Sequence, residues 1–139
     1  MLAVIKGLAK AEVPVVVHGF TDGRDVLPRD AWITLPGFLS QLPENAKLGS
    51  LTGRYFGMDR DHRWDRTQKA YDAIALGQAE FHADDGLQAL RAGYLRGERD
   101  EFLQATIIGG YSGMQDGDGL IMMNFRADRA RQILDCFYR

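Results

Sequence analysis

The chain has 139 residues, close to the commonest size of one folded domain, so a single hydrophobic core is expected. Its composition, with 45% hydrophobic and 26% charged residues, is that of a globular protein and excludes a disordered chain. A net charge of −2 argues against general binding to nucleic acid, and no apolar run approaches the roughly 20 residues that span a membrane. The single cysteine, Cys136, excludes an internal disulfide, and a reducing cytoplasm is the expected compartment.

The first third of the chain alternates helical and strand-like patterns. Residues 2–11 have helical spacing, and residues 13–20 are a β-branched run typical of a strand buried on both faces. A turn rich in Asp and Gly follows, after which Asp30 is placed to cap a helix that continues to about residue 42. Residues 47–52 predict a second strand.

The rest of the chain continues this alternation. A helix is predicted to begin within or just after residues 53–66, with Trp64 packed in the core, and another covers residues 87–95. Residues 105–110 and 119–125 predict further strands, and the second of these leads directly into a C-terminal helix. The pattern therefore predicts a single α/β domain with a largely parallel sheet flanked by helices.

Arginines follow three of the predicted strands. Arg24 comes after the first strand, Arg54 after the second, and Arg126 after residues 119–125. Ligands of open α/β sheets bind beyond the carboxyl ends of the strands, so parallel strands would bring these arginines to one crevice. Guanidinium groups match the oxygens of carboxylates and phosphates, and the sequence therefore predicts a site for a small anion.

Two further features bear on this site. Arg126 and Arg129 share one face in the first turn of the last predicted helix, where positive charge opposes the helix dipole; an anion site explains them better than a solvated surface. Asp25 beside Arg24 is either an ion-paired turn residue or a proton-transfer group, and spacing alone favours the turn. The histidines have no metal-ligand spacing, so no metal site is predicted, and His18 is expected to be a hydrogen-bonded core residue.

Three motifs, taken together, resemble a known family. HGFTDGRD (18–25), SLTGRYFGMDRDHRWDRTQKAYDA (50–73) and DGDGLIMMNFRADRARQI (116–133) are similar to segments of the cofactor-independent (2,3-bisphosphoglycerate-independent) phosphoglycerate mutases, in the same order and with similar spacing. Members of that family are much longer and have two domains. A phosphatase-like domain carries a serine nucleophile and two metal ions, commonly manganese, and a phosphotransferase domain holds the substrate. The resemblance implies that residues 1–139 are much of the phosphotransferase domain.

The resemblance also implies roles for individual residues. Arg24 and Asp25 would contact the glycerate part of the substrate, with Asp25 serving in proton transfer at its hydroxyl groups. The anionic groups would be bound by four further arginines: Arg54, Arg60, Arg126 and Arg129. The serine nucleophile and the metal ligands of the family belong to segments absent from this sequence. The chain alone is therefore expected to bind 2- or 3-phosphoglycerate weakly and to have no mutase activity.

Two other classes of function stay open on the residues alone. A nucleic-acid-binding module would use the arginines and aromatic residues of residues 53–66, although the pI of 5.9 argues against it. A purely structural or interaction domain would pair those arginines with neighbouring aspartates. The expected partners are phosphoglycerate and the phosphatase-like domain of the same protein, with no nucleic acid and no membrane, and a monomer is expected.

Overall fold

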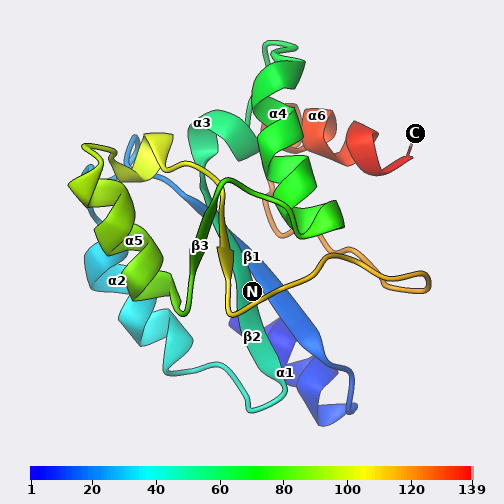
Figure 1. Cartoon of the computed structure of the whole chain (residues 1–139). Helices are drawn as coiled ribbons and strands as arrows, with labels where there is room; N and C mark the ends of the chain where they lie inside the picture. Colours follow the sequence, from blue (N-terminus) through cyan, green and yellow to red (C-terminus); the bar gives the residue numbers. More distant parts are fainter. Residues whose placement is uncertain (139) are drawn as a thin grey trace.

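The structure, a computed structural model that describes residues 1–138, is built on a four-stranded sheet in the order β1-β2-β4-β3 (Figure 1). β1 (Val15–Thr21) runs parallel to β2 (Ala46–Gly53), and β3 (Phe81–Ala83) runs parallel to β4 (Thr106–Ile108). β2 and β4 are antiparallel. The α/β class with a largely parallel sheet is confirmed, but β1 and β2 end at one edge of the sheet and β3 and β4 end at the opposite edge.

The helices connect the strands and cover the sheet. In chain order they are α1 (Leu2–Lys10), α2 (Ala31–Leu39), α3 (Arg54–Gly57), α4 (Trp64–Tyr71), the π-helical turn η1 (Asp72–Leu76), α5 (Gly86–Leu95), the 3-10 turn η2 (Asp100–Phe102) and α6 (Ala127–Tyr138). α2 and α5 pack against each other on one side of the sheet, and α3, α4 and α6 gather beyond the carboxyl ends of β1 and β2 (Figure 1). No helix in the described part of the chain combines the length and apolarity needed to cross a membrane.

Two of the three hydrophobic clusters in residues 1–138 join the helices to the sheet and to one another. The larger one joins the sheet to α1 and α5 through buried aliphatic side chains, among them Leu48, Leu51 and Leu90. Each such side chain stabilises the fold by roughly 1.5–3 kcal/mol when fully buried. The smaller cluster packs Ile133 of α6 against Ala70 and Ile74. α6 is therefore attached mainly through α4 and η1, and Phe20 of β1 also packs against this cluster.

Three predictions about the elements are wrong. Residues 119–125 form no strand, because their backbone pairs with no neighbouring strand; Phe125 is 97% exposed and the segment is part of the long loop that leads back to α6 (Figure 1). β1 is not buried on both faces, since it lies at the sheet edge beside a groove of about 870 Å³ that residues 117–124 also line. Trp64 is 42% exposed instead of packed in the core.

The helix after residue 30 is present but begins differently from the prediction. Asp30 makes no capping bond through its side chain. Instead the buried carboxylate of Asp100, far away in the sequence, accepts a hydrogen bond of 2.8 Å from the backbone N–H of Ala31. A tertiary contact thus provides a hydrogen-bond acceptor for a backbone N–H in the first turn of α2. The residues near Asp30 could not indicate this contact, because Asp100 is distant in the sequence.

Candidate anion-binding site

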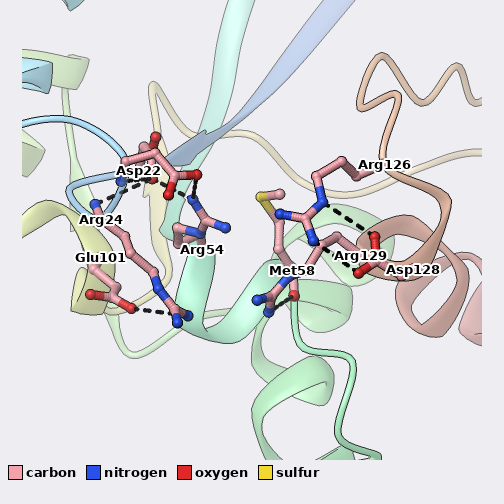
Figure 2. A network of polar contacts seen from close by, with 9 residues as sticks. Asp22, Arg24, Arg54, Met58, Glu101, Arg126, Asp128 and Arg129 are labelled. Carbon is pink, nitrogen blue, oxygen red and sulfur yellow. Dashed lines mark hydrogen bonds and ion pairs between the residues drawn. The ribbon is translucent and has the colours of Figure 1, made fainter.

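A pocket of about 280 Å³ lies beyond the carboxyl ends of β1 and β2, and arginine side chains dominate it. Arg24 comes from the loop after β1, Arg54 is the first residue of α3, and Arg129 lies in the first turn of α6. The complete lining is Arg24, Arg54, Tyr55, Asp59, Asp61, Arg66, Glu101, Phe102 and Arg129. Segments far apart in the chain therefore deliver guanidinium groups to one place, as Figure 2 shows for these three.

Arg54 is buried and fixed by two carboxylates. Its Nη1 donates to Oδ1 of Asp22 at 2.6 Å and to Oδ2 of Asp25 at 2.7 Å, and the side chain is 6% exposed. Burial alone would lower the pKa of Arg54, but the two carboxylates raise it above its ordinary value. The guanidinium group is therefore permanently charged and held in one orientation.

The backbone around Arg54 explains its position. β2 ends at Gly53, where a Cβ atom would lie only 2.3 Å from the carbonyl oxygen of Glu101. The close approach of two backbones requires glycine at that point. It also brings η2, which contributes Glu101 and Phe102, to the rim of the pocket.

The turn after β1 is organised by Asp22. Its Oδ1 accepts hydrogen bonds from the backbone N–H groups of Arg24 at 3.2 Å and Asp25 at 3.3 Å, and Gly23 supplies a positive φ of 62°. Burial alone would raise the pKa of Asp22, yet the hydrogen bonds from Arg54 and from these two N–H groups lower it. Asp22 therefore forms the turn, as predicted, and also binds Arg54, which was not predicted.

Arg24 and Asp25 are accessible to a ligand. Their side chains are 56% and 68% exposed, and Arg24 is 4.0 Å from Oε1 of Glu101. Asp25 does not line the pocket but contacts it through Arg54. The geometry favours neither of the two roles considered for Asp25, because an ion-paired residue that is mostly exposed suits both.

The positive charge of Arg129 has fewer negatively charged partners than the charges of the other arginines in the pocket. Its Nη1 donates to the carbonyl oxygen of Met58 at 3.2 Å, its buried Nε finds no hydrogen-bond partner among residues 1–138, and no carboxylate of those residues lies within 4.0 Å. Burial lowers the pKa of Arg129, and so do four neighbouring arginines: Arg60, Arg54, Arg126 and Arg24. The charge at this point is therefore positive and uncompensated.

Arg60 and Arg126 lie beside the pocket and share Asp128. Arg60 Nη1 is 2.7 Å and Arg126 Nη2 is 3.0 Å from Oδ2 of Asp128, and these contacts lower the pKa of that carboxyl to about 2. Neither arginine lines the pocket. The strand expected before Arg126 is absent, but α6 still brings this residue next to Arg129 (Figure 2).

Sequence reasoning missed several lining residues. Arg66 was interpreted as part of a helix start; its guanidinium lies 4.0 Å above the ring of Tyr55 and 3.3 Å from Oδ1 of Asp59. The signal available in the sequence was that Arg66 lies within residues 53–66, where arginines and aspartates are concentrated. Glu101 and Phe102 come from a short turn without any motif, and no signal in the sequence indicated them.

The donors of the pocket suit an anion, not a metal ion. No group of three His, Cys, Asp or Glu side chains in residues 1–138 is placed to hold a metal ion. The chain is an α/β domain, and several guanidinium groups with carboxylates that orient them are suited to a small, multiply charged anion.

Comparison with known proteins identifies the family. The family model for the N-terminus of BPG-independent phosphoglycerate mutase (BPG-independent PGAM) matches residues 1–139, so the chain belongs to this family, and the resemblance found in the sequence is confirmed. The 2,3-bisphosphoglycerate-independent phosphoglycerate mutase of Dinoroseobacter shibae is 52% identical over 134 residues, which are 96% of this chain and 26% of that protein. The enzyme of the same name from Agrobacterium fabrum is 48% identical over 132 residues, which are 95% of this chain and 26% of that protein.

A solved structure agrees with the sequence relatives. A crystal structure of Leishmania mexicana phosphoglycerate mutase at low cobalt concentration superposes with a TM-score of 0.86 and 25% identity. The match covers 98% of this chain and 28% of that one. The chain therefore has the fold of part of a phosphoglycerate mutase, an isomerase, and spans about a quarter of the length of these relatives.

Proposed function

We propose that residues 1–139 are the phosphotransferase domain of a phosphoglycerate mutase and that the arginine pocket binds 2- or 3-phosphoglycerate. The observation that carries this proposal is the uncompensated charge at Arg129, which is crowded by other arginines and bonded only to a main-chain carbonyl. A carboxylate or phosphate in the pocket would complete its hydrogen bonding and neutralise the excess charge.

The individual roles follow from rigidity and exposure. Arg54, fixed by two carboxylates, would orient one anionic group of the ligand, and the exposed Arg24 would close over it. Arg60, Arg126 and Arg129 would add charge from the α6 side. Asp25, accessible beside Arg54, would accept the proton of a substrate hydroxyl, because a general base must lie within hydrogen-bond reach of that proton.

The chemical step would require parts of the protein that lie outside this chain. The relatives are about four times as long, and we place the serine nucleophile and two manganese ions on a phosphatase-like domain that would partner this one. The residues described here offer no cluster for those ions, and no metal-dependent step is assigned to them. A monomeric state and a cytoplasmic location fit the enzyme and the single cysteine.

Calorimetric titration of the chain with 3-phosphoglycerate tests the proposal. We expect saturable binding that is tighter than that of inorganic phosphate, and we expect Arg24→Ala to weaken it by about tenfold, as loss of one charge-assisted hydrogen bond does. Arg91→Ala, on the exposed face of α5, is the matched control and should leave the affinity unchanged. Equal weak affinity for all anions, unaffected by Arg24→Ala, would contradict the proposal and favour a purely structural domain.

Assay of mutase turnover tests the second part. With manganese supplied, the isolated chain should not interconvert 3- and 2-phosphoglycerate. Appreciable conversion would show that the nucleophile is not confined to another domain. The nucleic-acid alternative receives no support from the pocket, in which Arg54 and Arg66 are bonded to aspartates and the arginines surround a volume of only about 280 Å³.

A further inference from the structure

Gln132 of α6 is a buried polar side chain that does not line the pocket and yet connects its two sides. It is 5% exposed and lies one turn beyond Arg129 on the same helix. Its Nε2 donates to Oδ2 of Asp59 at 2.8 Å and to Oγ1 of Thr67 at 2.6 Å. Its Oε1 accepts the backbone N–H of His62 at 2.9 Å.

These contacts fix the orientation of the amide. The nitrogen faces a carboxylate, which can only accept, and the oxygen faces a backbone N–H, which can only donate. A rotated amide would lose both bonds. All three bonds of Gln132 can therefore form in only one arrangement of α6 relative to the loop of residues 58–63 and to α4.

Asp59, which lines the pocket, connects Gln132 to the other residues of this loop. Besides the amide of Gln132, its carboxylate accepts the backbone N–H groups of Asp61 at 3.2 Å and Arg63 at 3.0 Å, and the guanidinium of Arg66 at 3.3 Å. Burial alone would raise the pKa of Asp59, but the hydrogen bond from Gln132 and the other contacts lower it. The loop that follows α3 is thus organised around one buried carboxylate bonded to α6.

The position of α6 matters because this helix carries Arg129. Residues 109–126, which lead to α6, form neither helix nor strand, and the apolar attachment of α6 is the small cluster around Ile133. The hydrogen bond from Arg129 to the carbonyl of Met58 spans the same junction as the Gln132–Asp59 bond. Arg60 of the same loop also pairs with Asp128 of α6, but both of these side chains are exposed, so the amide network is the buried polar link across the junction.

We infer that Gln132 is a positioning residue for anion binding: by holding α6 against residues 58–63, it sets Arg129 at the spacing from Arg54 that the ligand requires. This inference rests on the proposed function of the pocket. Precise spacing of charged donors is worth much in affinity, since displacements of about 1 Å in binding groups can cost up to about 100-fold in function.

The experiment compares two substitutions of Gln132 in the 139-residue chain, by calorimetric titration with 3-phosphoglycerate. Gln132→Met keeps the length of the side chain but removes its hydrogen bonds, and should weaken binding about tenfold or more. Gln132→Glu places a carboxylate against Asp59 at neutral pH, where the two repel each other. Below about pH 5.5, a proton shared by the pair would restore the bond to Asp59 and still leave an oxygen for the N–H of His62.

The affinity of Gln132→Glu relative to wild type should therefore recover on acidification from pH 8 to pH 5.5. Charged groups that both proteins share enter this ratio equally, among them the ligand, the exposed His62 and Arg66, which faces Asp59 from α4. Gln68→Glu is the matched control, because the exposed Gln68 also donates to an aspartate, Asp72, at 2.6 Å. The affinity of Gln68→Glu for 3-phosphoglycerate, divided by that of wild type, should stay near one at both pH values.

The outcomes separate this inference from the proposed function. If wild type fails to bind 3-phosphoglycerate, the proposed function fails and the inference with it. If wild type binds and both Gln132 variants, shown to be folded by their thermal melting, bind equally well, only the inference is overturned. Should Gln132→Met not fold, Gln132→Glu at pH 5.5 supplies the folded reference. The inference would then be overturned if the affinity of Gln132→Glu relative to wild type did not change with pH.

Discussion

Arg54 is buried and Arg129 half-buried, and their guanidinium groups are compensated differently. Arg54 is bonded to two carboxylates, so its desolvation is offset within the free protein. Arg129 has a single carbonyl partner and one buried N–H without any partner in residues 1–138. Incomplete pairing of this kind is typical of binding sites, where the missing interactions are supplied by a ligand and the free protein is less stable than it could be.

Arg129→Met should therefore separate stability from binding. Removing a poorly compensated half-buried charge is expected to leave the free energy of unfolding unchanged or to increase it by up to about 1 kcal/mol. The affinity for 3-phosphoglycerate should fall by at least tenfold, because a charge-assisted hydrogen bond contributes about 1.5–3 kcal/mol. Urea unfolding and calorimetric titration measure the two effects.

Arg131→Met is the control for that substitution, since Arg131 is an exposed residue of the same helix. It should change neither quantity appreciably. A large loss of stability in Arg129→Met, with no greater loss of affinity than in Arg131→Met, would mean that Arg129 is a structural residue.

At the residue scale the sequence indicated pocket-lining residues where a side chain follows the end of a strand, whereas Arg60 and Arg126, which lie in motifs, do not line the pocket. Arg24 and Arg54 follow strand ends, and both line the pocket. The sequence could not predict residues whose role depends on tertiary neighbours. Glu101 and Asp100 lie in a turn that returns to β1 and β2 from a distant part of the chain, and nothing local distinguishes them.

At the element scale, η2 is the junction that joins α2 to the sheet. The Asp100 side chain is fully buried and accepts hydrogen bonds from the backbone N–H of Ala31 and from the hydroxyl of Tyr94. Its carbonyl oxygen accepts from Oγ1 of Thr21 at the end of β1, at 2.6 Å. One residue therefore connects two helices and a strand directly below the pocket.

Asp100→Ala should destabilise the protein by about 2–4 kcal/mol, because it leaves buried donors of α2 and α5 without an acceptor. Asp30→Ala, at the position where the sequence predicted the cap, should cost less than about 0.5 kcal/mol, because no side-chain capping bond is present. Equilibrium unfolding in urea compares the two. Equal effects would mean that Asp30 does cap α2 in solution.

Elements with strong local patterns were predicted well, including α5 and α6, because periodicity and caps are encoded locally. Residues 119–125 carry an apolar pattern but form no strand, since a strand also requires a hydrogen-bonded partner and no strand of residues 1–138 pairs with them. β3, only three residues long, is a strand because β4 pairs with it and was not predicted.

At the scale of the whole molecule, His18 links stability to pH. This half-buried ring bonds through Nδ1 to Oγ of Ser50 at 2.8 Å and contacts the edge of Tyr111, with 4.8 Å between ring centroids. Burial lowers the pKa of His18 to about 4. The expected hydrogen bond is present, but the residue lines the groove beside β1 and is not part of the core, and the neutral form is the one compatible with the folded state.

The unfolded chain, in which the pKa of His18 is about 6.5, takes up this proton more readily than the folded chain. Stability due to His18 is therefore complete above about pH 6.5 and is lost as the pH falls toward 4, by up to about 3 kcal/mol. Urea unfolding of wild type and His18→Gln at pH 7.5 and 5 measures this loss. The slope with pH should be smaller in His18→Gln; identical slopes would contradict the assignment, because Asp22 and Asp59 titrate in both proteins.

The loop that leads to α6 affects which part of the protein unfolds locally. Since residues 109–126 pair with no strand and α6 is held by a few contacts, this helix is suited to detach as a cooperative unit while the sheet stays folded. Arg129 would leave with it and divide the pocket in two. A bound anion would then suppress this partial opening by mass action, so the hydrogen exchange of α6 amides would report occupancy of a pocket that the helix only borders.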